Sequence, residues 1–196
     1  QPRENEECAA EHGCTPTQLL ARAGCVDPER PGAFTAVHAI HVDDRDRALL
    51  ASSNVCACPT TEADLGDGIV LASRYMSQGT TIALGSDSNS VIDLLQEARL
   101  LEMHERLQAR ARLRLAGPDG QVGRHLLAAA TRGGARALGR PELGQLAPGS
   151  PFDAITLHTR HRALLGVEGR HLLDAIMLTA TSAPIDRVFV GGARRR

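Results

Sequence analysis

The first half of the chain alternates between segments that are apolar throughout and segments that are apolar on one helical face. Residues 33–42, 55–58 and 80–85 are apolar runs without strict alternation, which is typical of parallel strands covered on both faces. Residues 15–23, 43–52 and 69–77 are predicted helices, and Thr15 is a suitable cap for the first of them. The polar residues 59–68 are predicted to form a loop. The order αβαβαβ predicts an α/β fold.

The pattern changes after Asp87. Residues 91–113 predict a long amphipathic helix, and residues 123–138 predict a second one that Gly133 and Gly134 weaken. Beyond a turn at 146–151, the sequence predicts a small β unit with strands at 153–157 and 187–190 and a helix at 172–179. We therefore expect two domains, residues 1–145 and residues 146–196. Because a closed (β/α)8 barrel takes about 250 residues, the first is predicted to be an open α/β domain or part of a barrel.

Composition narrows the range of partners. The chain has 196 residues and a formal net charge of -1, so neither nucleic acid nor a membrane is an expected partner. The arginines at positions 194–196 are predicted to be a solvated tail. The five cysteines include no Cys-x-x-Cys pair, which predicts reduced thiols in a cytoplasmic protein rather than disulfides or a zinc knuckle. Open sheet edges predict association, with a homodimer as one form.

Two histidines lie within the first apolar run. His38 and His41 are three residues apart, so on a continuous strand they would point to opposite faces and would not bind one metal together. We predict that His38 faces the barrel axis, because His41 adjoins the start of the next helix. The alternative is that His38 is a buried histidine satisfied by a hydrogen bond.

Polar residues also follow the other two runs. Asp87 follows the apolar run 80–85 after one serine, and a carboxylate there is costly unless it is paired or bound to a cation. The alternative for Asp87 is a cap of the next helix. In the predicted loop, Thr60, Thr61, Glu62 and Asp67 are candidates for contact with a polar substrate, and the alternative is a solvated loop.

Three motifs, in this order and at suitable distances, resemble those of the formimidoylglutamate deiminases, a family within the amidohydrolase superfamily. They are Val37-His38-Ala39-x-His41, the stretch CPTTEADLGDG at residues 58–68, and Gly85-Ser86-Asp87-Ser88. The second motif is the specific one, whereas the histidine and aspartate at strand ends also fit guanine deaminases and triazine hydrolases. The resemblance implies the C-terminal part of a (β/α)8 TIM barrel followed by a piece of a small β-sandwich domain.

The family resemblance also implies a reaction, the zinc-dependent hydrolysis of N-formimino-L-glutamate to N-formyl-L-glutamate and ammonia in histidine degradation. In it, Asp87 matches the aspartate that ligates Zn²⁺ and takes a proton from the attacking water, and His38 matches the histidine that orients the hydroxide. Asn89, a candidate for substrate contact together with Thr61, Glu62 and Asp67, stands where the family usually has histidine. The family's other zinc ligands and its acid–base glutamate would lie before Gln1. We therefore expect the chain by itself to be inactive, with a catalytically silent binding or structural domain as the alternative.

Overall fold

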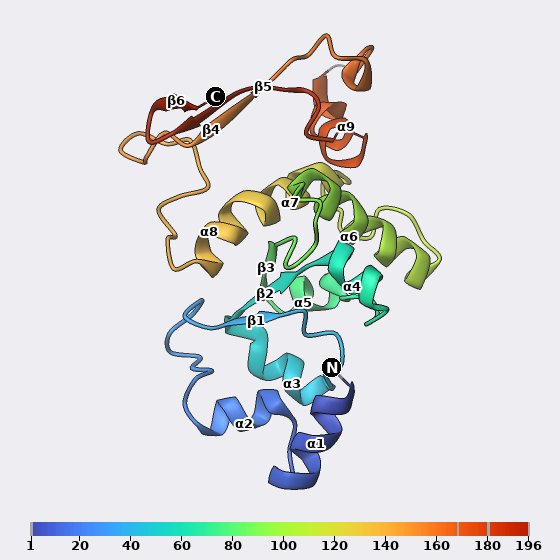
Figure 1. The fold of residues 1–196 in the computed structure, drawn as a ribbon, viewed down its shortest axis with the longest axis vertical. Helices are drawn as coiled ribbons and strands as arrows, with labels where there is room; N and C mark the ends of the chain where they lie inside the picture. The colour runs from blue at the N-terminus through green and yellow to red at the C-terminus, as the bar shows by residue number, and fades with distance from the viewer. Residues whose placement is uncertain (1, 168, 180, 196) are drawn as a thin grey trace.

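The computed structural model describes residues 2–167, 169–179 and 181–195, and its centre is a parallel sheet. The strands β1 (Thr35–Val37), β2 (Asn54–Ala57) and β3 (Thr81–Leu84) lie in the order β1-β2-β3. Both pairings are parallel, as the apolar runs predicted. Figure 1 shows the sheet at mid-height, with the N-terminal helices below it and later helices above it. The parallel sheet and its covering helices are those of a partial barrel.

The four helices predicted between residues 15 and 113 are present with shorter bounds, and a helix at Pro2–His12, which the sequence did not predict, precedes them. α2 (Pro16–Arg22) is capped by Thr15 as predicted, and α3 (Asp44–Leu49) begins with a capping box between Asp43 and Asp46. A 3-10 turn, Leu50–Ser52, extends α3 as far as the predicted helix. The other helices of this part are α1 (Pro2–His12), α4 (Pro59–Leu65), α5 (Ala72–Ser77) and α6 (Leu94–Ala109).

The first strand is shorter than predicted. It ends at Val37 because the next two residues, His38 and Ala39, have φ angles of 65° and 49°, which are in the left-handed region. A strand cannot continue through that conformation. The argument that His38 and His41 alternate along one strand is therefore wrong, because neither residue is in a strand.

The predicted loop at 59–68 is also wrong, because residues 59–65 form α4. Pro59 occupies the first turn, where its missing N–H costs nothing, and Gly66 ends the helix in the left-handed conformation. The backbone N–H of Thr60 donates to the carboxylate of Glu97, which is 37 residues away. A distant residue thus caps α4, and nothing in the local sequence reveals this contact.

The predicted helix at 123–138 is continuous but changes type. It consists of α7 (Val122–Ala128), a π-helical segment (Ala129–Gly133) and α8 (Gly134–Ala137). The π segment packs on β3, and a Cβ on Gly133 would lie 1.9 Å from the Ile82 carbonyl oxygen. Gly133 therefore allows the close approach of this helix to the sheet rather than merely weakening the helix.

The C-terminal part holds an antiparallel sheet in the order β4-β5-β6, formed by β4 (Ala154–Leu157), β5 (Ile185–Val190) and β6 (Ala193–Arg195). The predicted solvated tail is exposed, but its described residues form β6, which pairs with β5 through a turn at Gly191 and Gly192. Arg196 lies outside the described residues. α9 (Leu172–Thr179) packs on α6 and α7, with Met177 fully buried.

The main core lies between the parallel sheet and the helices that cover it. Strand residues such as Val55, Ala57 and Leu84 share it with Leu101 of α6 and Leu126 of α7. None of the helices in the described part of the chain is both long and apolar enough to cross a bilayer.

Candidate functional site

The candidate site lies where the parallel strands end. In a parallel sheet all C-terminal strand ends meet at one edge, and barrel enzymes build their active sites there. His38 directly follows β1, Cys58 directly follows β2, and Asp87 follows β3 after Gly85 and Ser86. The topology thus brings together residues that are 49 positions apart in the sequence, as the apolar runs predicted.

His38 lies between two carboxylates. Its Nδ1 atom is 3.1 Å from Oε1 of Glu62, and its Nε2 atom is 3.4 Å from Oδ2 of Asp87. The Glu62 side chain is 1% exposed and that of Asp87 is 38% exposed, whereas His38 lies between them at 20%. The row Glu62–His38–Asp87 therefore runs from the interior of the protein to a surface that a small molecule can reach.

The backbone at this edge is held in an unusual conformation. His38, Ala39 and Asp87 all have positive φ angles, although none is glycine. Such residues persist only where the surroundings hold them, and they cluster at functional sites. Here the His38 N–H donates to the Cys56 carbonyl at 2.8 Å, and the hydroxyl of the buried Tyr75 donates to the Ala39 carbonyl at 2.7 Å. These contacts fix the direction in which the His38 ring leaves the sheet.

The first turn of α4 is buried and supports the site from the interior of the protein. Thr60 donates to Glu97 from both its N–H and its hydroxyl, and Thr61 donates from its hydroxyl to the Ser86 carbonyl at 2.8 Å. Thr61 and Glu62 are 3% and 1% exposed, so these two candidates for substrate contact lie inside the protein. The Thr60 hydrogen bonds tie α4 to α6, and the Thr61 hydrogen bond ties α4 to the segment that carries Asp87.

Burial changes the acidity of the groups behind His38. Desolvation raises the pKa of Glu62, and hydrogen bonding from the Cys58 N–H and the neighbouring His38 oppose this effect. A hydrogen bond to Cys56, followed by burial and the nearby carboxylates, raises the pKa of the Cys58 thiol. Cys58 is therefore a neutral thiol at physiological pH, and all five cysteines are free, as the sequence predicted.

The remaining candidates lie farther along the same edge. His41 lies outside the row Glu62–His38–Asp87. Its Nε2 atom lies 2.7 Å from the carbonyl oxygen of Asp67 instead. The amide of Asn89 donates to Asp64 at 2.7 Å and accepts from the Val91 N–H at 2.9 Å. Both donor and acceptor atoms of the Asn89 side chain are thus engaged within the chain. The sequence reasoning missed Cys58 and Glu97, which contact Glu62 and Thr60, and Tyr75, which contacts Ala39 beside His38.

The donor atoms at this edge match part of a catalytic zinc site. Asp87 offers the carboxylate oxygen that zinc accepts, but a catalytic zinc takes three protein ligands, and no group of three ligand atoms that includes Asp87 is found in residues 2–167, 169–179 and 181–195. One group of three is present beside it: the ligand atoms of His38, Cys58 and Glu62 lie within 4.8 Å of one another. The fit to zinc at Asp87 is therefore partial within this chain.

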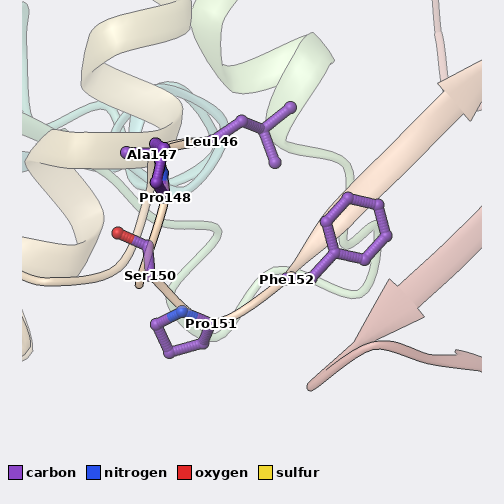
Figure 2. Close-up of a pocket in the computed structure, with 6 residues that line it drawn as sticks. All are labelled: Leu146, Ala147, Pro148, Ser150, Pro151 and Phe152. Atoms are coloured by element: carbon purple, nitrogen blue, oxygen red, sulfur yellow. The ribbon is translucent and has the colours of Figure 1, made fainter.

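A separate hollow lies in the segment that leads to the C-terminal sheet. It measures about 290 Å³ and is lined by Leu146, Ala147, Pro148, Ser150, Pro151 and Phe152 (Figure 2). The Phe152 ring also packs against Phe189 with 5.4 Å between ring centroids. This lining carries no ionisable side chain, so the hollow is not a second candidate for hydrolytic chemistry.

Known proteins resemble the chain along nearly its whole length. It is 37% identical over 195 residues to the formimidoylglutamate deiminase of Pseudomonas aeruginosa, which covers 98% of this chain and 42% of that protein. It is 33% identical over 184 residues to a probable guanine deaminase of Deinococcus radiodurans, which covers 87% of this chain and 39% of that protein. The chain therefore spans less than half the length of these relatives.

Solved structures agree with the barrel interpretation. The crystal structure of an amidohydrolase from Brucella melitensis superimposes with a TM-score of 0.85 at 32% identity, over 99% of this chain and 42% of that one. An adenosine deaminase from Xanthomonas campestris with bound zinc gives a TM-score of 0.87 at 24% identity, over 98% of this chain and 42% of that one, and this likeness shows the fold alone. The profile of the Amidohydrolase family matches residues 1–194. With Asp87 and His38 at the strand ends of a partial barrel, these matches establish that the chain belongs to the amidohydrolase family.

Proposed function

We propose that this chain carries the Asp87–His38 part of the active site of a zinc-dependent deiminase that hydrolyses N-formimino-L-glutamate. The observation that carries the proposal is the distance of 3.4 Å between His38 Nε2 and Asp87 Oδ2 at the C-terminal edge of the sheet. The two side chains come from different strand ends and are both partly exposed, so one small substrate can reach both. Asp87 is also the one metal ligand that we assign to this chain.

The chemistry follows from the groups in the row. A zinc ion bound at Asp87 would lower the pKa of a bound water to about 7 and so supply the hydroxide at neutral pH. Asp87 accepts a proton released from the water, because its carboxylate is accessible and faces the His38 ring. His38 orients the attacking oxygen and steadies the charge that develops on the substrate. Glu62 stays behind His38, away from the substrate.

The choice of substrate rests on the stretch at residues 58–68 and on the greater identity to the deiminase than to the guanine deaminase. An amidine hydrolase and a guanine deaminase both add water to a C=N carbon and release ammonia. They therefore need the same zinc, carboxylate and histidine. The second candidate function is guanine deamination, because the guanine deaminase relative also matches most of this chain.

A chimera tests the assignment. The part of the Pseudomonas aeruginosa deiminase that precedes the matched residues would be fused before Gln1, and ammonia release would be measured with N-formimino-L-glutamate and with guanine. We expect turnover of the first substrate only, and loss of turnover in the matched Asp87→Asn chimera. The unfused chain is a second control, for which we expect no stoichiometric zinc after dialysis and no ammonia release.

Two results would contradict the proposal. One is a folded, zinc-loaded chimera that releases ammonia from guanine and not from N-formimino-L-glutamate. The other is a folded, zinc-loaded chimera that acts on neither substrate. Zinc content and circular dichroism separate these results from a chimera that simply fails to fold.

A further inference from the structure

We propose that Glu62 is a positioning residue that keeps a proton on Nδ1 of His38, so that Nε2 is the nitrogen free to act toward Asp87 and the substrate. Glu62 was a candidate for substrate contact, but its side chain is 1% exposed and lies on the inner side of the His38 ring. The inference deepens the proposed function and rests on it for the role of His38 in catalysis. The placement of the proton itself can be measured without any activity.

The first step concerns a single oxygen atom. Oε1 of Glu62 accepts the backbone N–H of Cys58 at 2.7 Å, and the same Oε1 lies 3.1 Å from Nδ1 of His38. A backbone N–H can only donate, so Oε1 is an acceptor in this contact. An ionised Glu62 carboxylate can only accept hydrogen bonds, so Nδ1 of His38 is the donor toward Oε1.

The second step concerns what remains on the ring. A neutral imidazole has one N–H and one lone pair, so a proton held on Nδ1 leaves the lone pair on Nε2. Nε2 is the atom that faces Asp87 at 3.4 Å, on the partly exposed side of the row. Without Glu62, a histidine in water favours the opposite tautomer, with its proton on Nε2. Glu62 thus decides which nitrogen can accept a proton or a hydrogen bond at the site.

The third step concerns rigidity. Glu62 is in the first turn of α4, directly after Thr60, which contacts Glu97, and Thr61, which contacts Ser86. The left-handed backbone of His38 directs its ring toward this turn. A carboxylate with so little freedom sets the ring orientation as well as the tautomer, which is the usual role of a partner behind a catalytic histidine.

The group His38, Cys58 and Glu62 offers a competing interpretation as a metal site. The observed contacts favour the hydrogen bond instead, because Oε1 of Glu62 accepts from the Cys58 N–H and lies within hydrogen-bond distance of Nδ1 of His38. The experiment below separates the two interpretations.

Nuclear magnetic resonance of the chain with ring-labelled histidine tests the proposal. The ring nitrogens of His38, assigned with a His38→Asn sample, would be observed at about pH 9, well above the ordinary histidine pKa of about 6.5. We expect the Nδ1–H tautomer in the native chain and in Glu62→Gln, whose amide oxygen can still accept. In Glu62→Met, which cannot accept, we expect His38 to shift to the Nε2–H tautomer. Glu105→Met, which removes another buried carboxylate that hydrogen bonds to Ser73 rather than to His38, is the matched control and should leave the tautomer unchanged.

In the active chimera, we expect Glu62→Met to lower kcat about 10–100-fold with little change in KM, and Glu62→Gln to restore most of kcat. An Nε2–H tautomer in the native chain, or an unchanged tautomer in Glu62→Met, would overturn the proposal. So would loss of the Nδ1 proton of His38 on addition of one equivalent of zinc chloride, because a metal bound by the cluster must displace that proton. Failure of the deiminase assay alone leaves the tautomer result standing and counts against the proposed function only.

Discussion

Glu97 of α6 caps α4 by accepting hydrogen bonds from both the backbone N–H and the side-chain hydroxyl of Thr60. Glu97 is fully buried, and α6 carries two further buried carboxylates that accept backbone N–H groups in the same way. Glu105 accepts from Ser73 at the start of α5, and Glu102 accepts from Leu115. The three carboxylates of α6 therefore fix the first turns of α4 and α5 and the loop that contains Leu115.

Replacement of Glu97 by leucine should destabilise the chain. It leaves the N–H and hydroxyl of Thr60 buried without their partner, and each unsatisfied group costs about 1–3 kcal/mol. We expect the free energy of unfolding, measured with urea, to fall by at least that amount. Arg99→Gln, an exposed position on the same helix, is the control and should change it by less than about 0.5 kcal/mol. Equal effects of the two variants would contradict the capping role.

The same carboxylate should make stability depend on pH. Burial raises the pKa of Glu97 above its ordinary value of 4.5, and the contacts with Thr60 offset this only in part. The folded state then holds the proton more tightly than the unfolded state, so the Glu97 contribution to unfolding free energy falls as pH rises above 4.5. Urea unfolding of the native chain and of Glu97→Gln at several pH values should show a shallower decline in the variant. Parallel curves would show that Glu97 titrates normally.

Alanine substitutions at the adjacent Gly133 and Gly134 should have different effects on the stability of the fold. Both have helical φ and ψ angles, but a Cβ on Gly133 would lie 1.9 Å from the Ile82 carbonyl oxygen, whereas nothing lies within 4 Å of a Cβ on Gly134. Gly133→Ala must push the π segment away from β3 and should lower the melting temperature. Gly134→Ala should be neutral or stabilise by up to about 1 kcal/mol through helix propensity. Thermal unfolding of the two variants checks this, and a harmless Gly133→Ala would contradict the close packing.

The sequence predicted the positions of His38 and Asp87 at the sheet edge better than it predicted the contacts that hold them there. His38 and Asp87 could be found because His38 lies within one apolar run and Asp87 follows another, and parallel strands bring their C-terminal ends to one edge. The burial of Glu62 could not be found, because CPTTEADLGDG has the polarity of a loop and its cap, Glu97, is distant in sequence. The left-handed backbone of His38 and Ala39 has no local signal either, because neither residue is glycine. It depends on contacts such as that of Tyr75 with Ala39, which form only in the folded chain.

Tyr75 should titrate far from its ordinary range. It is the only tyrosine in the chain, which has no tryptophan, so ultraviolet absorbance of tyrosinate reports on this residue alone. Burial raises its pKa to about 12. The unfolded chain in urea should titrate near the usual value of about 10, so stability should fall as pH rises above that value. A midpoint near 10 in the folded protein would show that the hydroxyl is not buried against Ala39.

In a protein active on N-formimino-L-glutamate, substitutions of Asp87 and of His38 should have different effects on zinc content and kcat. Asp87→Ala removes the assigned metal ligand, so zinc content and kcat should fall together. His38→Asn should keep zinc but lower kcat by roughly 10²–10⁴-fold, the usual size of the effect for a group that moves or positions a proton. His41→Asn is the matched control, because the His41 ring contacts the Asp67 carbonyl and not Asp87, and its effect should be mild. Zinc analysis and steady-state kinetics of the three variants decide the matter. If His41→Asn inactivated the protein and His38→Asn did not, the assignment of the catalytic histidine would be wrong.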